Sequence, residues 1–145
     1  MTKYFAHKCQ FDGLTFDSTT ERDRYITLLH QQKTGVISNL RRQISYTVIP
    51  KQTRQIIVHL KTKDKVVERV IEQAAHYTCD FIYVESGVYV MEEVKSRITK
   101  MARDYPLRRK LMIQKIETHN KKNRSQWKFR EVEYKNKNTI TIKDY

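Results

Sequence analysis

The sequence is poor in the residues that disulfide-rich, fibrous and disordered chains use in quantity. Its 145 residues include only two cysteines, three glycines and two prolines. Cys9 and Cys79 lie in different segments, and no second Cys/His pair stands at zinc-site spacing, so neither a disulfide framework nor a zinc site is predicted. So little glycine and proline excludes a collagen-like or low-complexity chain. The length suits one domain with a single hydrophobic core.

The sequence also lacks a secretory signal, an apolar run of membrane-spanning length and a glycine-rich phosphate loop. We therefore expect no membrane partner, a reduced cytoplasmic setting and no P-loop chemistry. Acidic residues are scarce as well, since 16 Asp and Glu stand against 29 Lys and Arg, a formal charge of +13. This excess indicates an anionic partner, and nucleic acid is the partner whose binding phosphate contacts dominate.

The most informative stretch consists of two β-branched and aromatic runs, 77–85 and 88–95, joined at Ser86-Gly87. This pattern predicts a β-hairpin. A two-residue loop places Asp80 opposite Glu93, with both side chains on one face. Opposed like charges destabilise a sheet unless something neutralises them. A hard divalent cation such as Mg²⁺, which binds carboxylate oxygens and keeps several waters, is the expected reason for the pair.

Two further residues belong to the same prediction. Lys95 lies two residues past Glu93 and so shares its face, whereas Glu92 points the other way. Two carboxylates and an ammonium group are therefore expected to converge on one small patch. An Asp followed at a distance by Glu-x-Lys is also the form of the PD-(D/E)XK nuclease motif.

A helix is predicted over about 19–33, because Ser18 and Glu21 form a capping-box pattern. Glu21 either caps this helix only or also joins the acidic patch. Tyr25 and Leu28 follow it at helical spacing, so Glu21 is expected on the apolar face, where an unpaired carboxylate is unfavourable. Arg24 is expected off that stripe, in solvent or against DNA.

Three segments, 16–21, 80–83 and 93–95, together resemble the small phage-encoded PD-(D/E)XK nucleases, Holliday-junction-resolvase-like enzymes of the restriction-endonuclease-like fold. The resemblance covers roughly residues 11–116. It implies hydrolysis of DNA phosphodiesters with Mg²⁺, for which Mn²⁺ can substitute. The implied metal residues are Asp80, Glu93 and Glu21. Lys95 is implied to offset phosphate charge and to position or deprotonate the attacking water, and Gln43 to lie near the active site.

The remaining pattern predicts an α/β or α+β fold, with a mixed central sheet that carries the hairpin and helices at about 19–33 and 104–118. Strands are expected at 43–49 and 127–134, and 139–142 is either a short strand or mobile. Runs at 55–60 and 66–71 around a charged turn predict a β-hairpin arm within 51–75, for DNA, for a second subunit or without function. Residues 1–145 would then form one nuclease domain.

Basic residues near the acidic patch are expected either to contact DNA phosphates or to be simply solvated: Arg41, Arg42, Arg97, Lys100, Arg108, Arg109, Lys110 and Lys115. Three functions stay open: an endonuclease of branched or duplex DNA, a sequence-specific homing or restriction enzyme, and a nucleic-acid-binding module without chemistry. Dependence on a divalent cation would separate the first two from the third. Because one site cuts one strand, we also expect a homodimer or a higher homo-oligomer.

Overall fold

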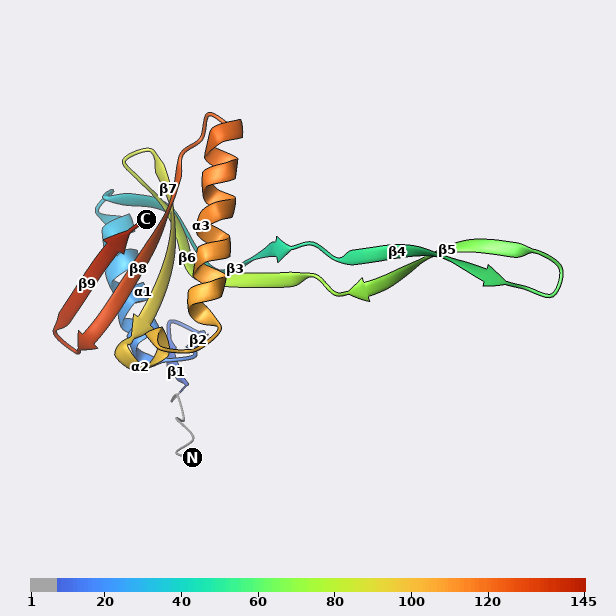
Figure 1. Ribbon diagram of the computed structural model, residues 1–145. Coiled ribbons are helices and arrows are strands. Elements are labelled where there is room, and N and C mark those ends of the chain that lie inside the picture. The colour runs from blue at the N-terminus through green and yellow to red at the C-terminus, as the bar shows by residue number, and fades with distance from the viewer. Residues whose placement is uncertain (1–7) are drawn as a thin grey trace. The chain divides into compact units, whose positions relative to one another are not determined.

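A computed structural model describes residues 8–145 of the chain (Figure 1). It divides into two compact units. The main unit comprises Thr78–Tyr145 and the described part of Met1–Ile44, and the hairpin unit comprises Ser45–Tyr77. That residues 1–145 form one nuclease domain stays a prediction. The two strands expected within 51–75 are present as β4 (Gln52–His59) and β5 (Asp64–Glu72).

The main unit is built on a five-stranded mixed sheet. In spatial order its strands are β3 (Ile37–Ile49), β6 (Ala75–Glu85), β7 (Val88–Ser96), β8 (Trp127–Asn136) and β9 (Thr139–Asp144). β6 and β7 pair antiparallel, β7 and β8 pair parallel, and β8 and β9 pair antiparallel. A mixed sheet with flanking helices confirms the predicted α+β class. β3 begins earlier than the strand predicted at 43–49, because Ile37, 3% exposed, already packs into the core.

Helices precede and follow the β6–β7 hairpin. α1 (Thr19–Lys33) has the predicted bounds, and the Ser18 side chain caps it by accepting a hydrogen bond from the Glu21 backbone N–H at 3.1 Å. A small hairpin, β1 (Cys9–Phe11) and β2 (Leu14–Phe16), precedes it. After β7 come a single turn, α2 (Arg97–Lys100), and α3 (Tyr105–Lys122). α3 continues past the predicted end at 118 because neither glycine nor proline interrupts it. None of the helices within residues 8–145 is long and apolar enough to cross a membrane.

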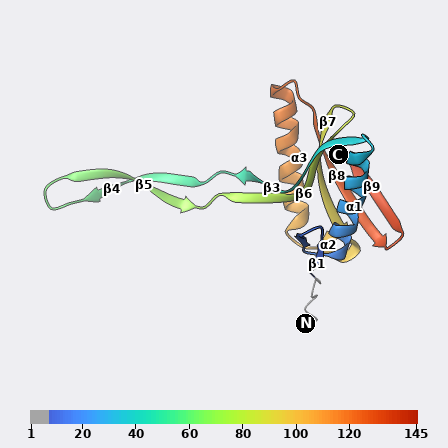
Figure 2. The same cartoon turned by 180° about the vertical axis from the view of Figure 1, so that it is seen from behind.

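The two long helices cover opposite faces of the sheet (Figures 1 and 2). On one face, Leu28 of α1 packs with Tyr83 of β6 and Val90 of β7 in the main core. On the other face, the Tyr105 hydroxyl of α3 donates to the Glu131 carboxylate of β8 at 2.5 Å. Since β7 pairs Glu93 with Glu131, the Glu93 side chain lies on the α3 face, and its neighbour Glu92 lies on the α1 face.

The expectation that Arg24 lies in solvent is wrong, because Arg24 is 5% exposed. Its guanidinium donates to both carboxylate oxygens of Glu92, at 2.6 and 2.9 Å, and the Tyr83 hydroxyl donates to the same carboxylate. Arg24 stands three residues after Glu21 and four before Leu28, so it belongs to the buried stripe of α1. The sheet surface that this stripe covers carries the neutralising carboxylate, and the pair is buried as a unit.

We expect Glu92→Ala to destabilise the fold by about 3–5 kcal/mol, because it leaves the Arg24 charge buried without a partner. The double change Arg24→Met/Glu92→Met removes both charges and should cost clearly less. Urea unfolding followed by circular dichroism measures both variants. A matched control is Glu117→Ala, an exposed carboxylate of α3, which should change stability by no more than about 0.5 kcal/mol. Equal losses for Glu92→Ala and Glu117→Ala would contradict the buried-pair interpretation.

Candidate functional site

The β6–β7 hairpin has the predicted register. Its turn residues Ser86 and Gly87 have φ values of 50° and 77°, as a two-residue turn with two positive φ angles requires. Glu85 pairs with Val88, and the register continues to Phe81 opposite Glu92. The next position along this register sets Asp80 beside Glu93. The hairpin thus brings together the two carboxylates that the sequence predicted to meet.

Asp80 lies among other carboxylates and forms no ion pair of its own with a described residue. Its Oδ2 accepts a hydrogen bond from the Val94 backbone N–H at 2.8 Å, and Gln43 Nε2 lies 3.5 Å from Oδ1. The pKa of Asp80 is raised well above its ordinary value of 3.8, first by loss of solvation and then by repulsion from Glu93 and Glu21. Lys95 and the Val94 N–H oppose this rise. A cation at this position would relieve the repulsion.

Glu21 comes to the same place from α1. It is 5% exposed, and its Oε1 accepts a hydrogen bond from Gln43 Nε2 at 2.8 Å. Burial raises the pKa of Glu21, and Gln43 and Arg42 oppose the rise. Gln43 has φ 51°, a left-handed conformation that a residue with a side chain adopts at a cost of order 1 kcal/mol. The strained Gln43 thereby links Glu21 to Asp80, so both residues predicted beside the hairpin carboxylates do lie there.

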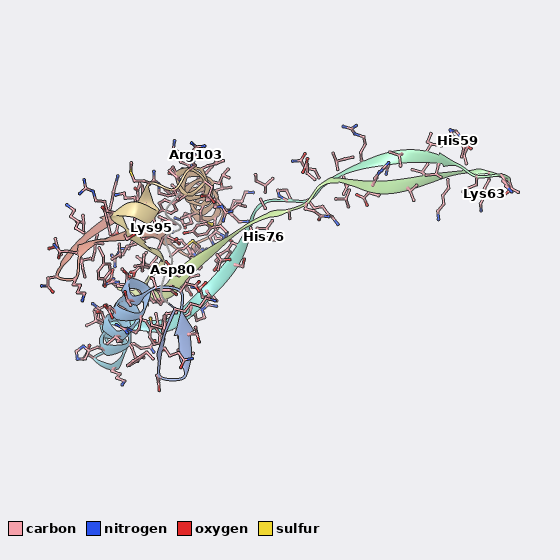
Figure 3. All side chains as sticks on the ribbon, turned by 90° about the horizontal axis from the view of Figure 1, so that it is seen from below. His59, Lys63, His76, Asp80, Lys95 and Arg103 are labelled. Carbon is pink, nitrogen blue, oxygen red and sulfur yellow. The ribbon has the colours of Figure 1, made fainter. Side chains whose placement is uncertain are left out.

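Lys95 supplies the positive charge of the site. Its Nζ forms an ion pair with Glu93 Oε1, and the two side chains are 18% and 7% exposed. The same Nζ lies 4.5 Å from the ring centroid of Tyr105 in α3. Asp80 on β6 and Lys95 on β7 are labelled in Figure 3, which views the molecule from below. Held by a carboxylate and an aromatic ring, the ammonium group has a restricted position.

Three of the site residues, Glu21, Asp80 and Lys95, border an open pocket of about 240 Å³. Its lining comes from the start of α1, from β6 and β7, and from α2: Asp17, Ser18, Thr20, Glu21, Asp80, Val94, Lys95, Ser96 and Thr99. Asp17 is a pocket carboxylate that the sequence argument passed over. Asp17 directly precedes the helix cap Ser18, which places it at the same end of α1 as Glu21.

Glu131 is the second residue that sequence reasoning missed. It lies on β8 beside Glu93 and is 1% exposed. Besides Tyr105, it contacts Lys100 Nζ at 3.0 Å and Arg109 at 3.3 Å. The alternation along 127–134 could have placed Glu131 on one face of a strand, but nothing in the sequence states that β8 lies beside β7. Glu131 therefore neutralises two of the basic residues that follow the Glu-x-Lys triplet, Lys100 and Arg109.

The basic residues expected on DNA fall into two groups. Three are held by the protein: Arg42 lies 4.0 Å over the Phe16 ring and donates to the Thr15 carbonyl, while Lys100 and Arg109 contact Glu131. The others have exposed side chains: Arg41, Arg97, Arg108, Lys110 and Lys115. Within the exposed group, Arg108 pairs with Asp104 of the same helix at 3.3 Å. Phosphate contact stays a prediction for all eight.

No three His, Cys, Asp or Glu side chains among residues 8–145 stand close enough to form a ready metal cage. The donor set nevertheless suits Mg²⁺, which in proteins is commonly held by one or two carboxylates and retains several waters. Asp80 and Glu93 supply such a pair, and Gln43 links Glu21 to Asp80. Carboxylate donors suit Mg²⁺ and Mn²⁺, whereas structural zinc sites are built mainly from Cys and His.

Comparison with known proteins gives one match, which covers most of the chain. Residues 1–136 match the model of a family described as "Protein of unknown function (DUF1064)". No curated protein and no solved structure matches the chain. The matched residues include every strand and helix of the main unit except β9, and also the complete hairpin unit. The chain belongs to the DUF1064 family.

Proposed function

We propose that this protein is a divalent-metal-dependent endonuclease that hydrolyses DNA phosphodiesters on a restriction-endonuclease-like fold. The observation that carries the proposal is the position of Asp80. It lies beside Glu93 and Glu21, its pKa is raised by their charges and by burial, and it has no ion-pair partner among the described residues. Folding alone gives no reason for such repulsion, whereas a cation held between Asp80 and Glu93 does.

Asp80 and Glu93 would hold Mg²⁺ or Mn²⁺, with Glu21 bound directly or through water. A bound ion of this kind supplies Lewis-acid polarisation of the phosphate and lowers the pKa of water. The residues of the chain do the rest. Gln43 fixes the Glu21 carboxylate, and the Val94 N–H fixes that of Asp80. Lys95, on the rim of the pocket, offsets the charge that develops on the phosphate and positions the attacking water.

The formal charge of +13 supports DNA as the substrate, because a strongly basic surface concentrates polyanions near the acidic pocket. One pocket cuts one strand. We therefore propose that the active form is a homodimer or a larger homo-oligomer when both strands, or two arms of a junction, are cut.

The deciding experiment incubates the protein with duplex, single-stranded and four-way-junction DNA, in Mg²⁺, in Mn²⁺ and in EDTA. We expect cleavage of at least one substrate with either metal and none in EDTA. Thermal unfolding should also shift upward when Mg²⁺ is added to metal-free protein, because a ligand that binds only the folded state stabilises it. Binding without cleavage, and without any shift by Mg²⁺, would leave a nucleic-acid-binding module and remove the enzyme from the proposal.

A further inference from the structure

The hairpin unit has two faces of opposite character. β4 and β5 pair antiparallel, and directly opposed residues share a face. One face, here called the basic face, consists of three opposed pairs: Arg54 with Arg69, Ile56 with Val67, and Val58 with Lys65. These three pairs carry three cations and no acid, and the pair Gln52–Glu72 lies beyond a register shift at Gln52/Thr53 and is not counted in the face. The alternate pairs form the acidic face, which carries Glu68 and Asp64 and no Lys or Arg: Thr53 with Val70, Gln55 with Glu68, Ile57 with Val66, and His59 with Asp64.

The acidic face satisfies its own charges, and the basic face does not. Glu68 accepts a hydrogen bond from the Thr53 hydroxyl at 2.5 Å, and Asp64 pairs with His59 at 2.7 Å, near the turn that Figure 3 marks with His59 and Lys63. Arg54 and Arg69 stand directly opposite each other, and no described residue forms an ion pair with either of them or with Lys65. Directly opposed like charges destabilise a strand pair. An external anion bound between Arg54 and Arg69 would relieve this repulsion.

We infer that the basic face of the β4–β5 hairpin binds duplex DNA, with Arg54, Arg69 and Lys65 on backbone phosphates and the ribbon in the major groove. This inference rests on the proposed function in one respect, namely that DNA is the substrate. The major groove, roughly 12 Å wide, admits a two-stranded β-ribbon. Four residues of strand separate the Arg pair from the Val58–Lys65 pair, about 13–14 Å at the rise of a strand. The cations are thus spaced to meet the phosphates on both rims of the groove.

The aliphatic pair between these charges fits the same partner. Ile56 and Val67 are half-buried, and they occupy the middle of the basic face, where the ribbon would meet the base edges. An apolar side chain there has the thymine methyl group as a contact. A two-stranded hairpin is also only marginally stable in water by itself, so binding along its length would stabilise both strands. A duplex supplies the anion, the groove and the apolar contact together.

The test measures binding of a labelled duplex to the full-length protein by fluorescence anisotropy, in EDTA so that no cleavage occurs. Arg54→Ala/Arg69→Ala should weaken binding about tenfold or more, the loss expected for charge-assisted contacts. It should also lower the slope of log affinity against log salt by roughly two units. The matched control, Ile57→Glu/Val70→Glu, changes the net charge equally, at exposed positions of the acidic face, and should bind within about twofold of wild type. Circular dichroism confirms that both variants fold.

Each outcome decides the inference. Equal weakening by the two variants would mean that net charge alone acts, and unchanged binding of the arginine variant would mean that the basic face is not used; both overturn it. Weaker binding of the control alone, with smaller particles in light scattering, would assign the acidic face to contact between copies and overturn it too. Metal-dependent cleavage with unchanged binding of the arginine variant would refute the hairpin inference and leave the proposed nuclease intact. If binding depends on the two arginines but the wild-type protein does not cleave DNA, the hairpin inference holds and the proposed nuclease is refuted.

Discussion

Asp80→Asn is expected to abolish Mg²⁺-dependent cleavage and to raise the unfolding temperature of the metal-free protein. Loss of a metal ligand removes several kcal/mol of transition-state stabilisation, which at about 1.4 kcal/mol per tenfold is roughly 10³-fold in rate. The stability gain has a separate origin, because asparagine can keep the hydrogen bond from the Val94 N–H without the repulsion from Glu93 and Glu21. Each kcal/mol of relieved repulsion should raise the Tm by roughly 4 °C.

The gain in unfolding temperature of Asp80→Asn should increase from acid to neutral pH. Because the pKa of Asp80 is raised in the folded protein, the folded protein holds this proton more tightly than the unfolded chain does. Wild-type stability therefore falls as the pH rises past the ordinary value of 3.8, and the loss is complete above the raised pKa. Asp80→Asn lacks this loss. Its advantage in Tm should be small at acid pH, where Asp80 is protonated in both states, and largest at neutral pH.

The control for this variant must be an exposed carboxylate, and Glu117→Gln on α3 serves. Glu92, next to Glu93 in the sequence, is unsuitable because its loss strands the buried Arg24 charge. Single-turnover cleavage and thermal unfolding in EDTA, each at two pH values, give the complete comparison. An Asp80→Asn protein that cuts normally, or that unfolds at a lower temperature than wild type at neutral pH, would falsify the assignment of Asp80 to a metal.

The features that could be predicted from sequence depend on neighbours along the chain. A turn at Ser86-Gly87 sets the register of its two strands, so one dipeptide was enough to bring Asp80 to Glu93. Ser18 and Glu21 lie within one helical turn, so the start of α1 followed from them. The strands of the sheet and the two flanking helices follow from the periodicity of these segments.

The features that could not be predicted depend on which segments become neighbours in space. Arg24 and Glu92 are 68 residues apart, and only the packing of α1 on β7 makes the burial of both charges favourable. From the sequence, Lys100 and Arg109 are expected to be surface cations. They pair with Glu131 because β8 lies beside β7 in the sheet. A single sequence carries no record of a parallel pairing between β7 and β8, because a long connection separates the two strands.

Removing Lys95 should lower the rate of cleavage, whereas removing the exposed cations of α3 should weaken DNA binding. Lys95 shares a strand face with Glu93 and lines the pocket, so we expect it to act where charge would develop on the reacting phosphate. Arg108 and Lys110 have exposed side chains on α3, and we expect them to act on the DNA backbone. Arg109 is excluded from this comparison, because its contact with Glu131 gives it a structural role.

Lys95→Ala is expected to keep its affinity for DNA and its thermal shift with Mg²⁺, but to cut about 10²-fold or more below wild type, the scale of general acid–base contributions. Losing an interaction made mainly in the transition state lowers kcat. Arg108→Ala/Lys110→Ala should instead raise KM and flatten the dependence of DNA affinity on salt concentration. Single-turnover cleavage at saturating protein removes binding from the comparison. Under those conditions the α3 double variant should recover the wild-type rate and Lys95→Ala should not. If Lys95→Ala also recovers, Lys95 is only another phosphate contact, and the catalytic role of the Glu-x-Lys triplet is lost with it.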